Sequence, residues 1–303
     1  MSNFDVIGFG ALNVDKLYKV NRIAGAEEES PIEAYSQTSG GSAANTIVGL
    51  ARLGCKVGFI GKVGNDPEGK VLIDDLRKES VDTSGIAKSE DHRSGSVMGF
   101  VDRKGARALY IDSGSNDTID TNDVRCEYVS ETRFLHLTSF VGDKSFETQK
   151  EVLRDLPSDV RVSFDPGALY ARKGFSQLEP IVKRTYILMP NIFELKLLTG
   201  ESDYKAGAQY LVRKGVLIVA VKLGEEGCYV TDGSEGHRID AVKVKVVDTT
   251  GAGDAFCAGF LYGLLGKRSL LECGKIGNFV ASRCIMEMGA RTGLPYLKDL
   301  RAG

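Results

Sequence analysis

The chain contains no tryptophan, only three histidines and only seven prolines among its 303 residues. The histidines, His92, His136 and His237, are scattered, and no Cys-x-x-Cys pair occurs, so the ligand spacing of a zinc site is missing. The six cysteines stand apart from one another, which favours free thiols in a reducing compartment. We therefore expect a cytoplasmic protein with neither a zinc centre nor a disulfide framework.

Long apolar runs and an excess of basic charge are also missing. No window approaches about 18 uncharged apolar residues, so the sequence predicts no membrane span. Residues 1–5 lack the basic and apolar segments of a signal peptide. Lys and Arg number 39 against 41 Asp and Glu, which gives a net charge of −2. A general nucleic-acid binder is usually more basic, so we expect no nucleic-acid partner and no membrane partner.

What the chain does have is an ordinary globular composition, with 42% hydrophobic and 26% charged residues, and a high glycine count of 36. Short β-branched runs alternate with helical patterns. This alternation predicts an α/β fold with a mostly parallel sheet covered by helices. The expected strands are residues 5–9, 57–60, 133–137, 160–164, 185–189, 216–221 and 228–231. The expected helices are residues 42–53, 66–78, 144–156, 192–198, 204–214, 254–265 and 270–288.

Two stretches lack a helix between their strands. Residues 16–37 and 94–112 are extended polar–apolar segments, and within the second a hairpin is predicted from 96–101 and 106–111, turning at 103–105. Because the two stretches are far apart in sequence, they predict a small β-sheet inserted on the α/β body and not a second folding unit. We expect one unit, 1–303, with this sheet, approximately residues 16–37 and 94–112, as a flap and with its core in residues 1–15, 38–93 and 113–303.

Two partial matches to nucleotide-binding motifs are poor. Gly8-Phe-Gly10 follows the first expected strand, but Asn13 replaces the third glycine of the dinucleotide fingerprint. Gly64–Lys70 approaches a P-loop, but Val71 stands where the hydroxyl that holds Mg²⁺ belongs. The first is weak evidence for a dehydrogenase, and the second is better explained as a turn capped by Asp66.

The first strong motif is Gly40-Gly-Ser-Ala-Ala-Asn-Thr, at the start of the helix expected over 42–53. Two glycines before a helix of small residues let a ligand approach the backbone closely. Asn45 projects from the first turns, and an amide offers both donors and acceptors, which suits a hydroxyl-rich ligand. The alternative is a tight turn that leads into a well-packed helix, and this segment alone does not decide between them.

The second strong motif is Val247-Asp-Thr-Thr-Gly-Ala-Gly-Asp-Ala-Phe. We expect a strand that ends near Val247, a glycine-rich turn and a helix that starts near Asp254. Backbone N–H groups at such a helix start form an anion site. A carboxylate at this position would repel a bound anion, so the presence of Asp254 requires an explanation. One explanation is that Asp254 is a base that takes the proton of an attacking hydroxyl. The alternative is an ordinary helix-capping aspartate.

Together the two motifs resemble, in order and separation, the two signatures of the ribokinase-like (PfkB) carbohydrate kinase family. The resemblance covers essentially the whole chain. It implies a three-layer ribokinase-like fold with a small β-sheet lid. It also implies an ATP-dependent kinase that transfers the γ-phosphate to a primary hydroxyl of a sugar or sugar-like substrate. Mg²⁺ would accompany ATP, K⁺ activates some members, and in several members the lid forms a homodimer interface.

The resemblance assigns four sets of residues. The catalytic set, with Asp254 as the base and the others as the anion hole, is Gly251, Ala252, Gly253 and Asp254. The substrate set is Asn13, Asp15, Gly40, Gly41 and Asn45. The nucleotide set is Lys222, Gly224, Gly227 and, in the adenine pocket, Asn278. The metal set is Asn191 and Glu194, for Mg²⁺ through water, and Asp248 and Thr250, for a monovalent cation. From the residues alone, Asn191 and Glu194 are equally a helix cap and a first-turn acid.

The sequence specifies the acceptor molecule less closely than it specifies the type of reaction. Ribokinases usually carry Lys after the double glycine, where this chain has Ser42, and no acidic substrate residue follows the strand that ends at Leu137. A nucleoside is the leading alternative, because the first motif also resembles the nucleoside kinases of the family. A keto-sugar-acid kinase would need a cationic pocket, which Arg107 or Arg172 could supply. A non-catalytic sugar or nucleotide sensor is a further alternative, although a sensor has no need of the base in residues 251–254.

Overall fold

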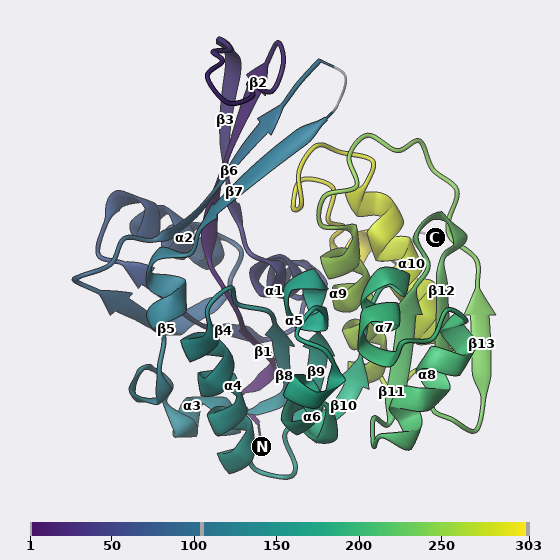
Figure 1. Ribbon diagram of the computed structural model, residues 1–303. Coiled ribbons are helices and arrows are strands. Elements are labelled where there is room, and N and C mark those ends of the chain that lie inside the picture. Colours follow the sequence, from purple (N-terminus) through teal and green to yellow (C-terminus); the bar gives the residue numbers. More distant parts are fainter. Residues whose placement is uncertain (1, 104–105, 301–303) are drawn as a thin grey trace.

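A mostly parallel sheet forms the centre of the molecule (Figure 1). The structure is a computed structural model that describes residues 2–103 and 106–300. The strands of this sheet are β1 (Phe4–Phe9), β4 (Val57–Gly64), β5 (Asp82–Ser89), β8 (Thr132–Thr138), β9 (Arg161–Asp165), β10 (Thr185–Leu188), β11 (Ile218–Lys222), β12 (Cys228–Thr231) and β13 (Gly236–Ile239). Their spatial order is β13-β12-β11-β10-β9-β8-β1-β4-β5. Neighbours from β11 to β5 are parallel, whereas β12 and β13 extend the sheet in antiparallel fashion.

Helices cover both faces of this sheet, because its strands are apolar on both sides. In β1, Val6 packs into the cluster on one face and Ile7 into the cluster on the other. The first face carries α1 (Ser42–Arg52), α2 (Pro67–Lys78), α9 (Ala252–Leu265), α10 (Leu270–Cys284) and the short α11 (Leu297–Leu300). The second carries α3 (Cys126–Ser130), α4 (Asp143–Asp155), α5 (Gly167–Ala171), α6 (Phe175–Arg184), α7 (Ile192–Thr199) and α8 (Tyr204–Arg213). None of the helices described has the length and apolar character needed to traverse a bilayer.

A second, smaller sheet stands away from the large one (Figure 1). It consists of β3 (Ile32–Gly40), β2 (Asn13–Val20), β6 (Gly95–Val101) and β7 (Arg107–Asp112), in that order. The expected small sheet is therefore confirmed. The β6–β7 hairpin is antiparallel from the pair of Ser96 with Asp112 onward, while Lys104 and Gly105 of its expected turn lie outside the described residues.

Several predicted boundaries were wrong. The chain over 241–247 forms no strand, and the Val247 N–H instead donates to the Ile285 carbonyl at 2.8 Å. α9 begins at Ala252, two residues before the expected start, because Gly251, with φ 77°, turns the chain directly into the helix. α10 ends at Cys284 and not at Met288. The sequence prediction also missed β5, β13, α3, α5, α6 and α11.

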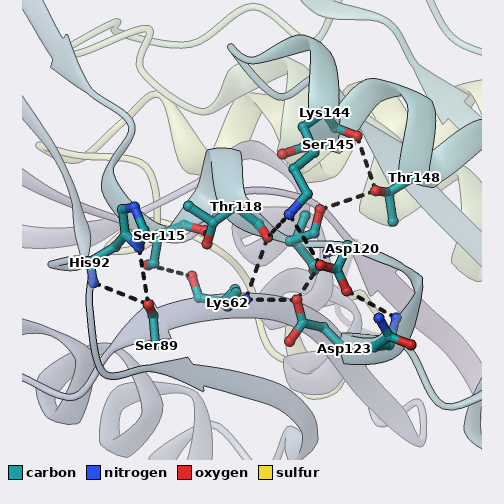
Figure 2. Close-up of polar contacts among 12 residues, drawn as sticks. Lys62, Ser89, His92, Ser115, Thr118, Asp120, Asp123, Lys144, Ser145 and Thr148 are labelled. Carbon is teal, nitrogen blue, oxygen red and sulfur yellow. Dashed lines mark hydrogen bonds and ion pairs between the residues drawn. The ribbon is translucent and has the colours of Figure 1, made fainter.

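Polar side chains tie the segment that follows the small sheet to the body (Figure 2). This segment contains the short helices η1 (Gly114–Thr118) and η2 (Thr121–Asp123). Lys62 of β4 donates to the Thr118 carbonyl at 3.4 Å and to Asp123 at 2.8 Å. Lys144 of α4 donates to the same carbonyl at 3.2 Å and to Asp120 at 3.1 Å. The segment is thus fixed between two elements of the body.

The six cysteines are free thiols. Cys228, Cys257, Cys273 and Cys284 are buried, and Cys126 is exposed.

Candidate active site

A cavity of about 350 Å³ lies at the carboxyl ends of β9 and β11, beside the first turn of α9. Asp165 ends β9, Lys222 ends β11, and Asn191, just after β10, bridges to Lys222. Ligands of open α/β sheets bind at such strand ends. The predicted site residues that line the cavity are Asn191, Glu194, Lys222, Gly224, Gly227, Ala252, Gly253, Asp254 and Asn278. Ser42, Asp165, Gly167, Phe256 and Ala281 complete the lining.

Asp254, the predicted base, is held by α1 and not by its own helix. Ser42 Oγ donates to its Oδ1 at 2.6 Å, and Asn45 Nδ2 donates to its Oδ2 at 2.8 Å. Asp254 is the third residue of α9, and the residue at the N-cap position is Gly251. The interpretation of Asp254 as a helix cap was therefore wrong, and the two sequence motifs meet at this carboxylate.

The turn before α9 leaves backbone donors at the cavity. Gly251 has φ 77°, and a Cβ there would lie 2.6 Å from Ala290 Cβ, so glycine is required. The Ala252 N–H is already used, because it donates to the Thr249 carbonyl at 3.2 Å. Over the stretches that the structure describes, no backbone carbonyl accepts from the N–H of Gly253 or Asp254. Gly253 and Asp254 both line the cavity, so their N–H groups are donors available there to an anion.

The environment of Asp254 makes it more basic than a free aspartate. Burial raises its pKa to about 6, although the hydrogen bonds from Ser42 and Asn45 act to lower it. Asp165 raises the pKa further, and Lys222 lowers it. A carboxyl group with a pKa near 6 is ionised at neutral pH and still accepts a proton readily, as a general base must.

Behind the anion site lies a buried ion pair. Lys222 Nζ donates to Asp165 Oδ2 at 2.5 Å, and the two side chains are 12% and 7% exposed. Burial alone would lower the pKa of Lys222, but Asp165 and the groups near it raise the pKa, so the ammonium stays charged. A Cβ on Gly253 would lie 3.3 Å from that ammonium. Lys222 thus lines the cavity as expected, with its charge already paired to Asp165.

Asn191 and Glu194 form a reciprocal capping box at the start of α7. Asn191 Oδ1 accepts from the Glu194 N–H, and Glu194 Oε2 accepts from the Asn191 N–H, both at 2.8 Å. Both residues also line the cavity. Burial, and next Asp165, raises the pKa of Glu194 to about 7. The helix-cap interpretation holds, and it leaves an amide and a carboxylate at the cavity, which are groups suited to Mg²⁺ and its water ligands.

Two of the predicted nucleotide residues, Gly227 and Asn278, lie against the end of β13. Asn278 Nδ2 donates to the carbonyls of Ile239 and Asp240 at 3.1 and 3.0 Å. Gly227 has φ 93°, and a Cβ there would lie 2.2 Å from the Ile239 carbonyl oxygen, so only glycine fits. Asn278 therefore shapes this end of the cavity through backbone contacts.

The predicted substrate residues lie at the base of the small sheet. Asn13 pairs with Gly40 in the β2–β3 ladder, and a Cβ on Gly40 would lie 2.2 Å from Asp15 Oδ2. Gly41 has φ 112° and passes close to the Ala11 carbonyl. Burial raises the pKa of Asp15 to about 6, while Arg291 acts to lower it. We call these predicted substrate residues the acceptor end, and one of them, Asn45, donates to Asp254.

Asn116 of η1 belongs to this end and was missed by the sequence prediction. The Leu12 N–H donates to Asn116 Oδ1, and Asn116 Nδ2 donates to the Leu12 carbonyl, each at 2.9 Å. The same Nδ2 donates to Asn13 Oδ1 at 2.9 Å. A backbone N–H only donates, so Leu12 fixes the orientation of Asn116, and Asn116 in turn fixes that of Asn13. Asn13 is left with its N–H donors for a ligand.

Replacing Asn116 with alanine should lower the free energy of unfolding by about 2 kcal/mol or more, because it leaves the buried N–H and C=O of Leu12 without partners. Urea unfolding followed by circular dichroism measures this. The matched control is Asn122→Ala in the exposed η2, which should change stability by less than about 0.5 kcal/mol. Equal effects of the two substitutions would contradict the prediction.

Arg291, in the loop after α10, was also missed. Its Nε donates to Asn45 Oδ1 at 2.8 Å, and its Nη2 donates to the Gly40 carbonyl at 3.4 Å. A single arginine in a turn has no sequence pattern that marks it as part of a site.

Like the predicted substrate residues and Gly251, the predicted cation residues and Arg172 are not part of the cavity lining. Asp248 Oδ1 accepts from the Thr250 N–H at 3.0 Å and from its Oγ1 at 2.7 Å, and Asp248 Oδ2 accepts from the Gly289 N–H at 2.9 Å. The monovalent-cation role of Asp248 and Thr250 stays a prediction. Arg172 is exposed and lies over the ring of Phe193, 5.5 Å from its centroid. The side chain of Arg107 lies outside what the structure describes.

The chain matches known proteins along most of its length. The family model for the pfkB family carbohydrate kinase matches residues 4–297. An uncharacterized sugar kinase from Archaeoglobus fulgidus is 46% identical over 255 residues, which are 83% of this chain and 100% of that protein. A 2-dehydro-3-deoxygluconokinase from Bacillus subtilis is 30% identical, over 98% of this chain and 94% of its own. The crystal structure of a ribokinase from Thermotoga maritima superposes with a TM-score of 0.88 at 26% identity, covering 99% of this chain and 98% of that one.

Proposed function

The chain belongs to the pfkB family of carbohydrate kinases, and from that premise we propose that it transfers the γ-phosphate of ATP to a primary hydroxyl of a neutral sugar. As a member of this family it is a sugar kinase, a phosphotransferase with an alcohol group as acceptor, on the ribokinase-like three-layer fold. The alternative of a non-catalytic sensor is therefore not retained.

One observation carries the proposal. The carboxylate of Asp254 lies between an acceptor end, reached through Asn45, and a cavity lined by the first turn of α9. An acceptor hydroxyl in contact with this carboxylate would face a phosphoryl group held by the N–H donors of Gly253 and Asp254. Base, nucleophile and anion donors would then meet at one point, as phosphoryl transfer requires.

In the proposed reaction, Asp254 takes the proton as the O–H bond of the acceptor breaks. The acceptor oxygen forms a bond to the γ-phosphorus, and the bond from this phosphorus to the β,γ-bridging oxygen breaks, leaving ADP. The N–H groups of Gly253 and Asp254 stabilise the charge on the phosphoryl oxygens. Asn191 and Glu194 would hold Mg²⁺ through water, and the ion would supply further charge neutralisation when bound. The small sheet would act as a lid that excludes water as a competing acceptor.

Charge favours a neutral acceptor over a sugar acid. Asp15 at the acceptor end and Asp254 next to it are both carboxylates, and the guanidinium of Arg291, which interacts with both, already donates to Asn45 and Gly40. A carboxylate on the substrate would add a third negative charge there. The name of the Bacillus subtilis relative points to a sugar acid, so the acid is an informative comparison in the test.

The test is ATP turnover with Mg²⁺, with and without K⁺, against neutral sugars, nucleosides and sugar acids. We expect the highest kcat/KM for a neutral sugar that has a primary hydroxyl. A nucleoside or a sugar acid as the best acceptor would replace the proposed substrate class. No phosphorylated product from any acceptor would contradict the proposed activity.

The activity should depend on pH through Asp254. Because only the ionised carboxylate accepts a proton and its pKa is about 6, kcat/KM should rise with pH up to about 6 and level off above it. A profile from about pH 5 to about pH 8 measures this. Asp15, whose pKa is also about 6, would steepen the same limb. A flat profile between about pH 5 and about pH 7 would contradict the assignment.

We further propose that the small sheet pairs with that of a second copy. Leu17, Leu109 and Ile111 are 40%, 59% and 50% exposed. The pairing of β2 with β6 and of β6 with β7 places these three side chains on the same face of the small sheet as Asp15. They form an apolar surface of a kind that a monomer seldom exposes. Sedimentation at micromolar concentration should show a dimer, and Leu109→Lys should dissociate it. A monomeric unmodified protein would exclude this pairing.

A further inference from the structure

Arg291 donates hydrogen bonds to two residues of the acceptor end. Its Nε–H donates to Asn45 Oδ1 at 2.8 Å, and one terminal nitrogen donates to the Gly40 carbonyl at 3.4 Å. It therefore contacts both ends of the first glycine motif, the turn and the helix. Asn45 is itself 6% exposed, so its amide has little freedom to exchange these partners for water.

The chemistry of a guanidinium decides how the Asn45 amide is turned. Arginine has donors and no acceptor, so the atom of Asn45 that faces it is the carbonyl oxygen. The amide nitrogen then points to the opposite side, where Asp254 Oδ2 lies 2.8 Å away. We propose that Arg291 is a positioning residue for catalysis, which acts by fixing the Asn45 amide so that its nitrogen donates to the base. This inference rests on the proposed kinase function.

The loop that carries Arg291 is fixed at several points. Arg52 donates to the carbonyls of Arg291 and Leu294 at 2.6 and 3.1 Å. The residue before Arg291, Ala290, packs against Gly251 at the anion turn. This loop thus contacts the turn before α9 through Ala290 and the acceptor end through Arg291. The fixed loop backbone determines the position of the Arg291 guanidinium. The guanidinium in turn determines the orientation of the Asn45 side chain.

The arrangement predicts which kinetic constants change. With its oxygen committed to Arg291, Asn45 has only N–H donors left, and one of them keeps the Asp254 carboxylate in place. Loss of that orientation should affect the acceptor and the proton transfer. It should leave the KM for ATP nearly unchanged, because Arg291 and Asn45 are not among the residues that line the cavity with the predicted nucleotide residues.

Arg291→Lys is the informative substitution, because it keeps the positive charge and removes the fork that reaches both Asn45 and Gly40. We expect kcat/KM for the acceptor to fall about 10- to 100-fold, the equivalent of one hydrogen bond to a charged group, with the KM for ATP within about twofold of that of the unmodified protein. Arg283→Lys, at an exposed position near the end of α10, is the matched control and should have no effect. An Arg291→Lys protein with unchanged kcat/KM would overturn the proposal.

A double-mutant cycle tests whether Arg291 acts through Asn45. Asn45→Ala should lower kcat/KM by a similar factor, and adding Arg291→Lys to it should cause little further loss. Fully additive losses would show that Arg291 acts independently of Asn45, which would also overturn the proposal.

A substrate-free readout separates this inference from the proposed function. The carboxyl ¹³C signal of Asp254, assigned with Asp254→Asn, should titrate at a higher pH in Arg291→Lys and in Asn45→Ala than in the unmodified protein, because the donated hydrogen bond favours the ionised form. An unchanged midpoint in Arg291→Lys would overturn the proposal even if no acceptor were phosphorylated. The other charged and titratable groups that face Asp254 and stay constant in this comparison are Asp165, Lys222, Glu194, Cys257 and Cys284.

Discussion

Replacing Asp254 with asparagine is expected to lower kcat by about 10²- to 10⁴-fold, the contribution typical of a general base. Asparagine has nearly the same shape as aspartate, and its carbonyl oxygen can still accept a hydrogen bond from Ser42 or Asn45. These two residues donate to the carboxylate in the unmodified protein. It cannot take the proton of the acceptor hydroxyl. Steady-state kinetics at saturating ATP and acceptor measure the loss, and a kcat close to that of the unmodified protein would remove Asp254 from this role.

The same substitution should not destabilise the fold at alkaline pH. The pKa of Asp254 is about 6 in the folded protein, above its ordinary value of 3.8. The folded state therefore binds this proton more tightly than the unfolded chain does. The resulting stabilisation is present below pH 3.8 and is lost as the pH rises through about 6. At about pH 8 asparagine removes a charge that partial burial disfavours, so the Tm should be equal or higher. A marked drop in Tm would assign the kinetic loss to misfolding.

Replacing Lys222 with methionine is expected to lower the free energy of unfolding by about 3–5 kcal/mol, the usual effect of removing one partner of a buried ion pair. Methionine fills much of the volume of the lysine stem, but the carboxylate of Asp165, in a side chain 7% exposed, loses the ammonium that lies 2.5 Å from it. Chemical unfolding at neutral pH gives the difference.

Two comparisons make this prediction specific. Adding Asp165→Asn to Lys222→Met removes the uncompensated charge and should restore most of the stability. Lys183→Met removes one partner of an exposed helical pair with Glu179, in which the side chains are 66% and 43% exposed, and should change stability by less than about 1 kcal/mol. Failure of the double variant to regain stability would show that the charge balance of this pair is not what the fold depends on.

The central sheet could be predicted because its strands are apolar on both faces, and a run such as Val6 and Ile7 has no other favourable position. The elements that were missed have local reasons. α6 contains Pro180, which in a sequence indicates a helix break. β5 is the edge strand Asp82–Ser89, with polar residues and Gly85 along it, and α3 and α5 are too short to show a helical period.

The glycine motifs could be predicted because each requires a backbone conformation that few residues allow, as at Gly41 and Gly251. The polar partners could not, because they come from distant parts of the chain. Arg291 lies 246 residues after Asn45, and Asn116 lies 104 residues after Leu12. Whether Lys222 has a free charge or a paired one likewise depends on Asp165, 57 residues earlier. Side-chain hydrogen bonds of this kind follow from packing and leave no local pattern.

The contact between α1 and α9 also determines when the site can exist during synthesis and folding. The hydrogen bond from Asn45 to Asp254 can form only after Asp254 is synthesised, 209 residues later. By contrast, β1, β4 and β8 are all present much earlier and can pair then. Loop closure over such a separation is slow relative to local pairing. Nascent chains that end before α9 should therefore have a partial sheet and no phosphotransfer activity. Catalytic competence then arises in one late step, when α9 packs on α1 and the loop with Arg291 closes behind them.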